Sequence, residues 1–444
     1  KSPGIQNGGC MLAYSPHRYR CCQHNHAHGW PYYAEELWLA TSDNGLAASL
    51  YSASKGEANV GDGTQVTVTE ETDYPFDDTV KLSLQTSEPV TFPLYLRVPR
   101  WCEDAKVKVN GDAVDESTEG GSYLVVDRRW ESGDTVELRF PMDIDVTVWD
   151  RDYENAISEP NGSVSVSRGP LTYSLKIEEK WVRNGGDDTW PEYDVVPAAD
   201  WNYGLVLDEQ DPAGSFSVTK KTDDVPRQPF TIENAPITLR AKARKIPEWE
   251  TDTNGLVGRM QPNPVKSDQP TETVTLVPMG CARLRISAFP RIGSGPEAHE
   301  WEEYTGPRVS HCFGGDTPMA LNDGRVPKDS NDHSIPRMTW WPHRGTTEWV
   351  QYEFDEAKNL SHSEVYWFDD RGQGQCRIPE SWKLLYREDG EWKPVDAVGA
   401  YGTARDTFNE VGFEPVETEA IRLQVKLQED YSGGILEWRV DGGE

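Results

Sequence analysis

A cluster of cysteine and histidine side chains near the N-terminus could do chemistry. Cys21 and Cys22 are adjacent, and four of the nine histidines stand close by, at positions 17, 24, 26 and 28. Thiolates and imidazoles are the ligands that Zn²⁺ prefers in proteins. A bound metal or a nearby cation also lowers the pKa of a thiol, so that the thiolate is a nucleophile near neutral pH. The cluster therefore points to zinc binding or nucleophilic catalysis.

The same cluster permits other interpretations. Adjacent cysteines can be small buried side chains, or they can form a vicinal disulfide in a redox protein, while the histidines can be surface residues. The spacing matches no common zinc finger, because no second cysteine pair completes it. The seven cysteines are odd in number and scattered along the chain, which does not describe a disulfide framework.

Charge and composition exclude several kinds of partner. The chain has 44 basic and 75 acidic residues, a net charge of −31, which repels phosphate backbones and anionic membrane surfaces. No apolar run approaches the roughly 20 residues of a membrane span. With 17 Trp and 18 Tyr against 11 Phe, the aromatic residues suit both β-sandwich cores and contacts with sugars. These features favour a neutral carbohydrate as the partner.

Hydrophobic periodicity places one helix at the start of the chain and strands after it. Residues 30–40 have apolar side chains at helical spacing and are followed by an Asp-Asn-Gly sequence typical of a helix end. From residue 46 the period changes to two, and Asn110-Gly111 marks a tight hairpin. Repeated short strands of this kind predict a β-sandwich over 46–148.

The rest of the chain also predicts β-structure. A length of 444 residues suggests about three domains. We expect a second β-sandwich at 149–293 and a jelly-roll sandwich at 300–444. The expected fold class is therefore mainly β, with tandem sandwiches. Residues 1–45 fit none of these units.

The cysteine segment resembles a known family. Arg20-Cys21-Cys22-x-x-Asn25, followed by a short helix, is similar to the Cys-Cys-x-x-Asn segment that closes the catalytic domain of glycoside hydrolase family 127, typified by β-L-arabinofuranosidases. Downstream sequences agree in the same order at 43–51, 74–77, 94–102, 106–111 and 167–173. The ordered matches cover about 20–290.

This resemblance implies a fold and a mechanism. The family has an (α/α)6 catalytic barrel followed by two β-sandwiches, so residues 1–45 are expected to be the C-terminal end of such a barrel. It implies a retaining enzyme in which Cys21 is a zinc-bound nucleophile and Cys22 is a second ligand. The other ligands, a Glu and a Cys, and the acid/base Glu lie upstream in the family. The chain is thus expected to be an incomplete catalytic unit, inactive alone.

The segment also departs from the family pattern. Gln23-His24 stands where Pro-Pro is common, and His28-Gly29-Trp30 replaces a stretch that usually contains Arg. We expect His24 and His26 to contact a different sugar, so the substrate is left as a plant or algal polysaccharide or glycan side chain.

Residues 305–444 resemble a discoidin-like (coagulation factor 5/8 type C) galactose-binding-like module. Such modules often hold a structural Ca²⁺, and Asp323 and Glu437 match positions that supply its oxygen ligands. Trp340 and Trp341 are candidates to stack on sugar, and filling the core is the competing interpretation. A module of this type favours an extracytoplasmic location.

Three hypotheses follow. The chain is a portion of a family 127-like glycosidase, a non-catalytic carbohydrate-binding array, or a metal or redox protein that uses Cys21 and Cys22.

Overall fold

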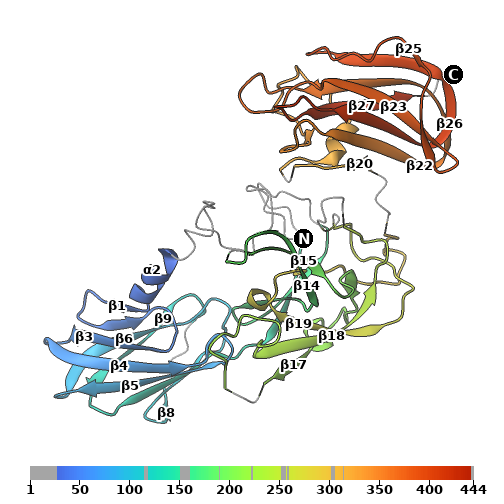
Figure 1. Cartoon of the computed structure of the whole chain (residues 1–444). Coiled ribbons are helices and arrows are strands. Elements are labelled where there is room, and N and C mark those ends of the chain that lie inside the picture. The colour runs from blue at the N-terminus through green and yellow to red at the C-terminus, as the bar shows by residue number, and fades with distance from the viewer. Residues whose placement is uncertain are drawn as a thin grey trace.

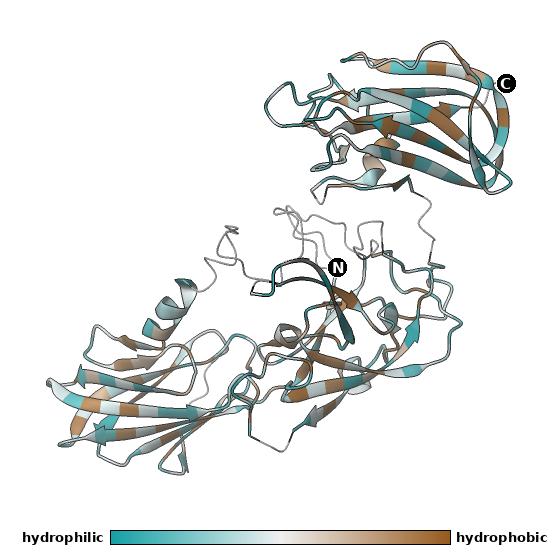
Figure 2. Ribbon diagram, in the orientation of Figure 1, coloured by the Kyte–Doolittle hydropathy of each residue, from teal (hydrophilic) through white to brown (hydrophobic). Residues whose placement is uncertain are grey.

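The fold is mainly β, as the sequence predicts (Figure 1). The structure is a computed structural model, and it describes residues 28–114, 119–150, 161–189, 191–221, 224–251, 257, 260–301, 306–313 and 315–441. Hydrophobic and hydrophilic residues alternate along many strands in Figure 2, which is the pattern of a strand with one buried face. Among the described helices, none combines the length and the apolar composition needed to cross a bilayer.

The first unit packs two mostly antiparallel sheets around one core. A four-stranded sheet has the order β1-β2-β6-β9, and a six-stranded sheet has the order β3-β4-β5-β10-β7-β8. The strands are β1 Trp38–Ala40, β2 Leu46–Ala48, β3 Ser54–Val60, β4 Thr64–Thr72, β5 Thr79–Thr86, β6 Val90–Arg97, β7 Lys106–Val109, β8 Asp112–Ala113, β9 Tyr123–Trp130 and β10 Thr135–Arg139. Asn110 and Gly111 join β7 to β8 with φ angles of 54° and 89°, which confirms the predicted hairpin.

The N-terminal helix is shorter than predicted. Helix α2 covers Gly29–Glu35, and the residues after it form strand β1, which pairs with β2. The Asp-Asn-Gly sequence is therefore a hairpin turn rather than a helix end: Asn44 has φ 59°, and the Thr41 amide donates to the Gly45 carbonyl oxygen (3.2 Å). Strand β1 thus lies before residue 46, where we placed the start of the first sandwich.

The second unit differs from the predicted sandwich. Its described strands form one seven-stranded sheet, ordered β11-β12-β13-β19-β18-β16 with β17 on β18, and a separate hairpin of β14 and β15. Irregular segments cover the sheet, since Trp249, Phe289 and Trp301 belong to its buried core. The strands are β11 Ile144–Val148, β12 Val164–Arg168, β13 Leu171–Leu175, β14 Glu179–Gly186, β15 Pro191–Pro197, β16 Tyr203–Leu205, β17 Ser217–Lys220, β18 Ile237–Lys245 and β19 Glu272–Pro278, with short 3-10 turns η2 Ala213–Ser215 and η3 Met279–Cys281.

A loop of the first unit inserts into the second. Residues 73–78 connect β4 to β5; in this loop Tyr74 packs against the first core, while Phe76 is only 4% exposed within the second core. Next to it, Asp77 forms an ion pair with Lys220 of β17. The two units are therefore joined by packing as well as by the chain.

The third unit contains an eight-stranded sheet that bends over its own core. The first part of β22 pairs with the end of β26 and the last part pairs with β27, with a register shift between Glu353 and Lys358. The elements are β20 Arg308–Val309, η4 Pro318–Leu321, β21 Met338–Thr339, β22 Thr347–Phe368, β23 Ser381–Glu388, β24 Glu391–Pro394, β25 Ala397–Val398, β26 Phe408–Lys426 and β27 Gly434–Asp441. The connecting segments 340–346, 369–378 and 428–433 are hydrogen-bonded to one another, and we call this side the loop end.

Candidate functional site

The segment that contains the predicted nucleophile lies outside the described residues. Cys21, Cys22, His24 and His26 precede residue 28, so the structure does not place them. The first described element after them in the sequence is α2, on which Trp30 and Tyr32 are 64% and 68% exposed. In the part of the chain that the structure describes, no group of three His, Cys, Asp or Glu side chains is arranged to hold a metal.

The cysteines that the structure describes lack the properties of a nucleophile. Cys102, Cys281, Cys312 and Cys376 are buried and free of disulfides. Burial raises the pKa of Cys281 to about 11 and that of Cys376 to about 12, so both are thiols at neutral pH. A thiol is a poor nucleophile and a poor metal ligand. These cysteines are therefore suited to packing.

The two predicted calcium ligands are close in space. Glu437, on β27, is 1% exposed, and its Oε1 accepts a hydrogen bond from Arg439 Nε (3.0 Å). Its Oε2 is buried and has no hydrogen-bond partner. Burial raises the pKa of Glu437 and the charge of Asp323 adds to this, whereas Arg439 and a hydrogen bond from the Gly324 backbone act in the opposite direction. An unpartnered buried carboxylate oxygen beside a second carboxylate is a suitable place for a cation.

A cavity opens beside this carboxylate. Its volume is about 760 Å³, and its lining combines aromatic and charged side chains. They come from the 320s turn, from the bend in β22 and from β27, and include Asn322, Phe354, Glu356, Lys358, Glu437 and Asp441. The cavity gives a route from solvent to Glu437.

The two candidate tryptophans have different roles. Trp340 is 0% exposed and packs within the third core, so it fills the core and the expectation that it stacks on sugar is wrong. Trp341 is partly exposed, and the guanidinium carbon of Arg344 lies 5.3 Å from its ring centroid. Trp340 has apolar surroundings and therefore packs, whereas Trp341 contacts solvent and is free to stack on a ligand. The sequence alone does not show which of the two tryptophans is buried.

The prediction from the sequence did not include the side chains that lie near Trp341. Arg344 donates to the side-chain oxygen of Gln375, and Arg377 lies 4.6 Å from the ring of Tyr431, which is 37% exposed. We call Trp341, Arg344, Gln375, Arg377 and Tyr431 the loop-end platform. Its members come from segments separated by many residues, so no local motif identifies them.

A pair of stacked histidines contacts the backbone of Trp341. The rings of His311 and His343 lie 4.1 Å apart with an interplanar angle of 19°. His343 Nδ1 pairs with Glu348 Oε1 (2.8 Å), and His311 Nε2 contacts the Trp341 carbonyl oxygen (2.7 Å). Burial favours a raised pKa for Glu348, but hydrogen bonds from Ser310, Thr346 and His343 hold the pKa of its carboxyl below the ordinary value. The carboxylate therefore stays charged and orients His343.

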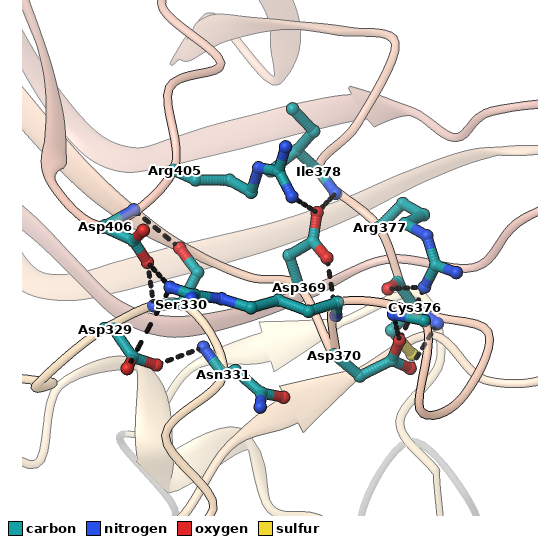
Figure 3. A network of polar contacts seen from close by, with 12 residues as sticks. Asp329, Ser330, Asn331, Asp369, Asp370, Cys376, Arg377, Ile378, Arg405 and Asp406 are labelled. Carbon is teal, nitrogen blue, oxygen red and sulfur yellow. Dashed lines mark hydrogen bonds and ion pairs between the residues drawn. The ribbon is translucent and has the colours of Figure 1, made fainter.

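A polar network holds the loops around Arg377 together (Figure 3). Asp406 accepts from the Ser330 amide (2.8 Å) and from Arg371 (2.6 Å), which ties three segments together. Asp370 accepts from the Cys376 amide (2.8 Å) and pairs with Arg377 (2.5 Å). Bonds of this kind hold Arg377 in place before any ligand arrives.

Comparison with known proteins adds one sequence match. Residues 45–142 match the family model described as beta-L-arabinofuranosidase, GH127 middle domain. The matched segment is the first sandwich. No curated protein matches the chain by sequence.

Several solved structures are similar to parts of the chain. A GH127 β-L-arabinofuranosidase from Geobacillus stearothermophilus T6 is 22% identical over 65% of this chain and 42% of its own, with a TM-score of 0.43. A GH127 β-arabinofuranosidase is 19% identical over 59% of this chain and 37% of its own (TM-score 0.39). A family 32 carbohydrate-binding module from C. perfringens NanJ, in complex with galactose, is 16% identical over 30% of this chain and 90% of its own (TM-score 0.24). The chain spans less than half the length of the solved arabinofuranosidases that it matches.

Proposed function

We propose that this chain is the C-terminal portion of a retaining, β-L-arabinofuranosidase-like glycoside hydrolase. The observation that carries the proposal is the GH127 middle-domain match at 45–142, which follows Cys21 and Cys22 in the sequence, with α2 and β1 between them. The proposed substrates are glycan side chains or polysaccharides of plants or algae. The discoidin resemblance supports an extracytoplasmic setting.

Cys21 is the proposed nucleophile. Cys22 and Cys21 would hold Zn²⁺, because adjacent thiolates are a donor set that this metal prefers. If zinc binds there, it would keep the Cys21 thiol ionised near neutral pH. The remaining ligands and the acid/base Glu would come from residues outside this chain. His24 and His26 are the proposed contacts with the sugar.

The proposed reaction has two steps. The Cys21 thiolate forms a C–S bond to the anomeric carbon as the glycosidic C–O bond breaks, and the acid/base Glu gives its proton to the leaving oxygen. Water then attacks the thioglycosyl carbon, the same Glu takes a proton from it, and the thiolate is released. Two inversions retain the configuration of the sugar.

A longer protein tests this proposal. We expect a protein extended at its N-terminus by its natural sequence to bind stoichiometric zinc and to hydrolyse a β-L-arabinofuranoside. The 444-residue chain should show no turnover, because the proposed acid/base Glu comes from residues outside it. Zinc analysis and sugar release measure both expectations, and turnover by the extended protein after zinc is removed would contradict them.

We also propose a structural Ca²⁺ at Asp323 and Glu437. The buried, unpartnered Glu437 Oε2 supports this site, with backbone carbonyls and water as the further oxygen ligands that Ca²⁺ requires. Calcium at 100 times its Kd should add about 2.7 kcal/mol to the free energy of unfolding. We expect Glu437→Gln to abolish the rise in Tm with calcium, whereas Glu356→Gln, an exposed residue of the same cavity, should keep it. A Tm that is equal in calcium and in chelator would contradict the site.

A second candidate function is non-catalytic carbohydrate binding at the loop-end platform. Exposed aromatic rings beside arginine and amide groups offer a sugar both a stacking face and hydrogen bonds. We expect Trp341→Ala to weaken glycan binding by the whole chain about tenfold, equivalent to about 1.4 kcal/mol. Trp392→Ala, on β24, is the matched control. A glycan that the whole chain binds on a glycan array serves as the ligand, and isothermal titration measures its affinity for both variants. Equal affinity for Trp341→Ala and the wild type would exclude the platform as the glycan-binding site.

A further inference from the structure

A buried carboxylate occupies a core position in the first unit. Along β4 the buried side chains alternate, and they are Val66, Val68 and then Glu70. Glu70 is 2% exposed, close to the 1% and 0% of the two valines. An acid at such a position costs stability when it is ionised, unless its surroundings compensate the charge. The contacts of Glu70 therefore indicate why it is there.

Glu70 connects β4 to the strand that follows α2. Its Oε1 accepts from the Ser52 amide (3.0 Å), and its Oε2 accepts from the Ser54 hydroxyl (3.2 Å). Ser54 Oγ in turn accepts from Trp38 Nε1 of β1 (3.1 Å). A continuous hydrogen-bonded path thus runs from β1 to the carboxylate.

The segment next to Ser52 is attached to the start of β1. The amides of Ser49 and Leu50 donate to the Leu37 carbonyl oxygen (3.0 and 3.4 Å). Arg97 Nε, on β6, donates to the Ser49 carbonyl oxygen (2.5 Å), and Tyr51 donates its hydroxyl to the Arg97 carbonyl oxygen (2.7 Å). Leu37 and Arg97 therefore hold this segment, which leads directly to Ser52, whose amide donates to Glu70.

The groups around Glu70 leave its charge poorly compensated. Burial raises the pKa of Glu70 to about 7, and the hydrogen bonds from Ser54 and Ser52 act against that rise. The titratable groups facing it are Tyr33 of α2 and Tyr51, and burial together with the Glu70 charge raises the pKa of both phenols. Arg97 lowers both pKa values in part, and Tyr74 also faces Tyr51. The phenols are neutral throughout the range in which Glu70 titrates.

We propose that Glu70 is a pH-sensitive latch that fastens β1 to the rest of the first sandwich. When Glu70 is protonated, the neutral side chain is compatible with its buried place and the latch is closed. Ionisation favours an open state in which water reaches the carboxylate. Because the pKa in the closed state is raised, this stabilisation is full below about pH 4.5 and is lost as the pH rises through about 7.

Amide hydrogen exchange in the 444-residue chain tests the latch without reference to activity, so the inference stands apart from the proposed function. We expect protection of the Ser49 and Leu50 amides to fall about 30-fold from pH 5.5 to 8.5, after correction for intrinsic exchange, with closed and open pKa values of about 7 and 4.5. The Leu84 amide, which donates to Asp134 in the same unit, serves as the internal reference.

Variants separate the latch from general stability. Glu70→Gln imitates the protonated acid, so its protection at Ser49 and Leu50 should be flat between pH 5.5 and 8.5. Glu71→Gln, the exposed neighbour, should behave as wild type. If Glu70→Gln does not fold, Ser54→Ala should lower protection at every pH while protection still falls with rising pH, because Ser54 opposes the rise in the Glu70 pKa and is not its cause. The same pH dependence in Glu70→Gln and wild type, or no pH dependence in wild type, would overturn the proposal.

Discussion

Phe76→Ala is expected to lower the free energy of unfolding by about 3–5 kcal/mol, the cost of removing a large aromatic side chain from a packed core. The magnitude is high because Phe76 is 4% exposed and lies in the second core, although its chain neighbours belong to the first unit. Removing it leaves a cavity and weakens the link between the two units. Urea unfolding followed by tryptophan fluorescence measures the loss.

Phe230 is the matched control for this prediction. Its ring lies 5.9 Å from that of Phe76, but its side chain is 49% exposed. Phe230→Ala should therefore cost about 1 kcal/mol or less. Equal losses in the two variants would show that Phe76 does not anchor the first unit to the second.

Cys21→Ser is expected to lower the turnover of the N-terminally extended protein by at least about a thousandfold, because a serine hydroxyl is not ionised near neutral pH as a zinc-held thiolate is. Initial rates on a β-L-arabinofuranoside measure the effect. Cys10→Ser, a change of the same kind upstream of the pair, should keep the rate. A Cys21→Ser variant that retains the wild-type rate would remove the proposed mechanism.

The strands could be predicted because hydrophobic and polar residues alternate with a period of two within each short segment of the sequence. The β7–β8 hairpin followed from Asn110-Gly111, whose left-handed conformations are those that a tight turn requires. The start of the first unit could not be predicted in the same way. Residues 30–40 have a helical pattern of apolar residues, but pairing with Leu46–Ala48 makes Trp38–Ala40 a strand. Tertiary pairing overrode local periodicity there.

In the candidate site, too, some features could be predicted from the sequence and others could not. Asp323 and Glu437 were paired from a resemblance, and the structure brings their charges within reach of each other. Trp340 and Trp341 are identical in type and adjacent, so only the folded chain shows that the first is buried and the second partly exposed. Glu70 has the same period as the neighbouring valines, and nothing in the sequence marks it as a buried acid.

The most direct test of the account is the identity of the atom that carries the sugar during turnover. The extended protein would be quenched with acid while it hydrolyses a β-L-arabinofuranoside, digested, and analysed by mass spectrometry. We expect a peptide in which a pentosyl group is bound to the sulfur of Cys21. A pentosyl group on an Asp or Glu carboxylate, with Cys21 unmodified, would contradict it.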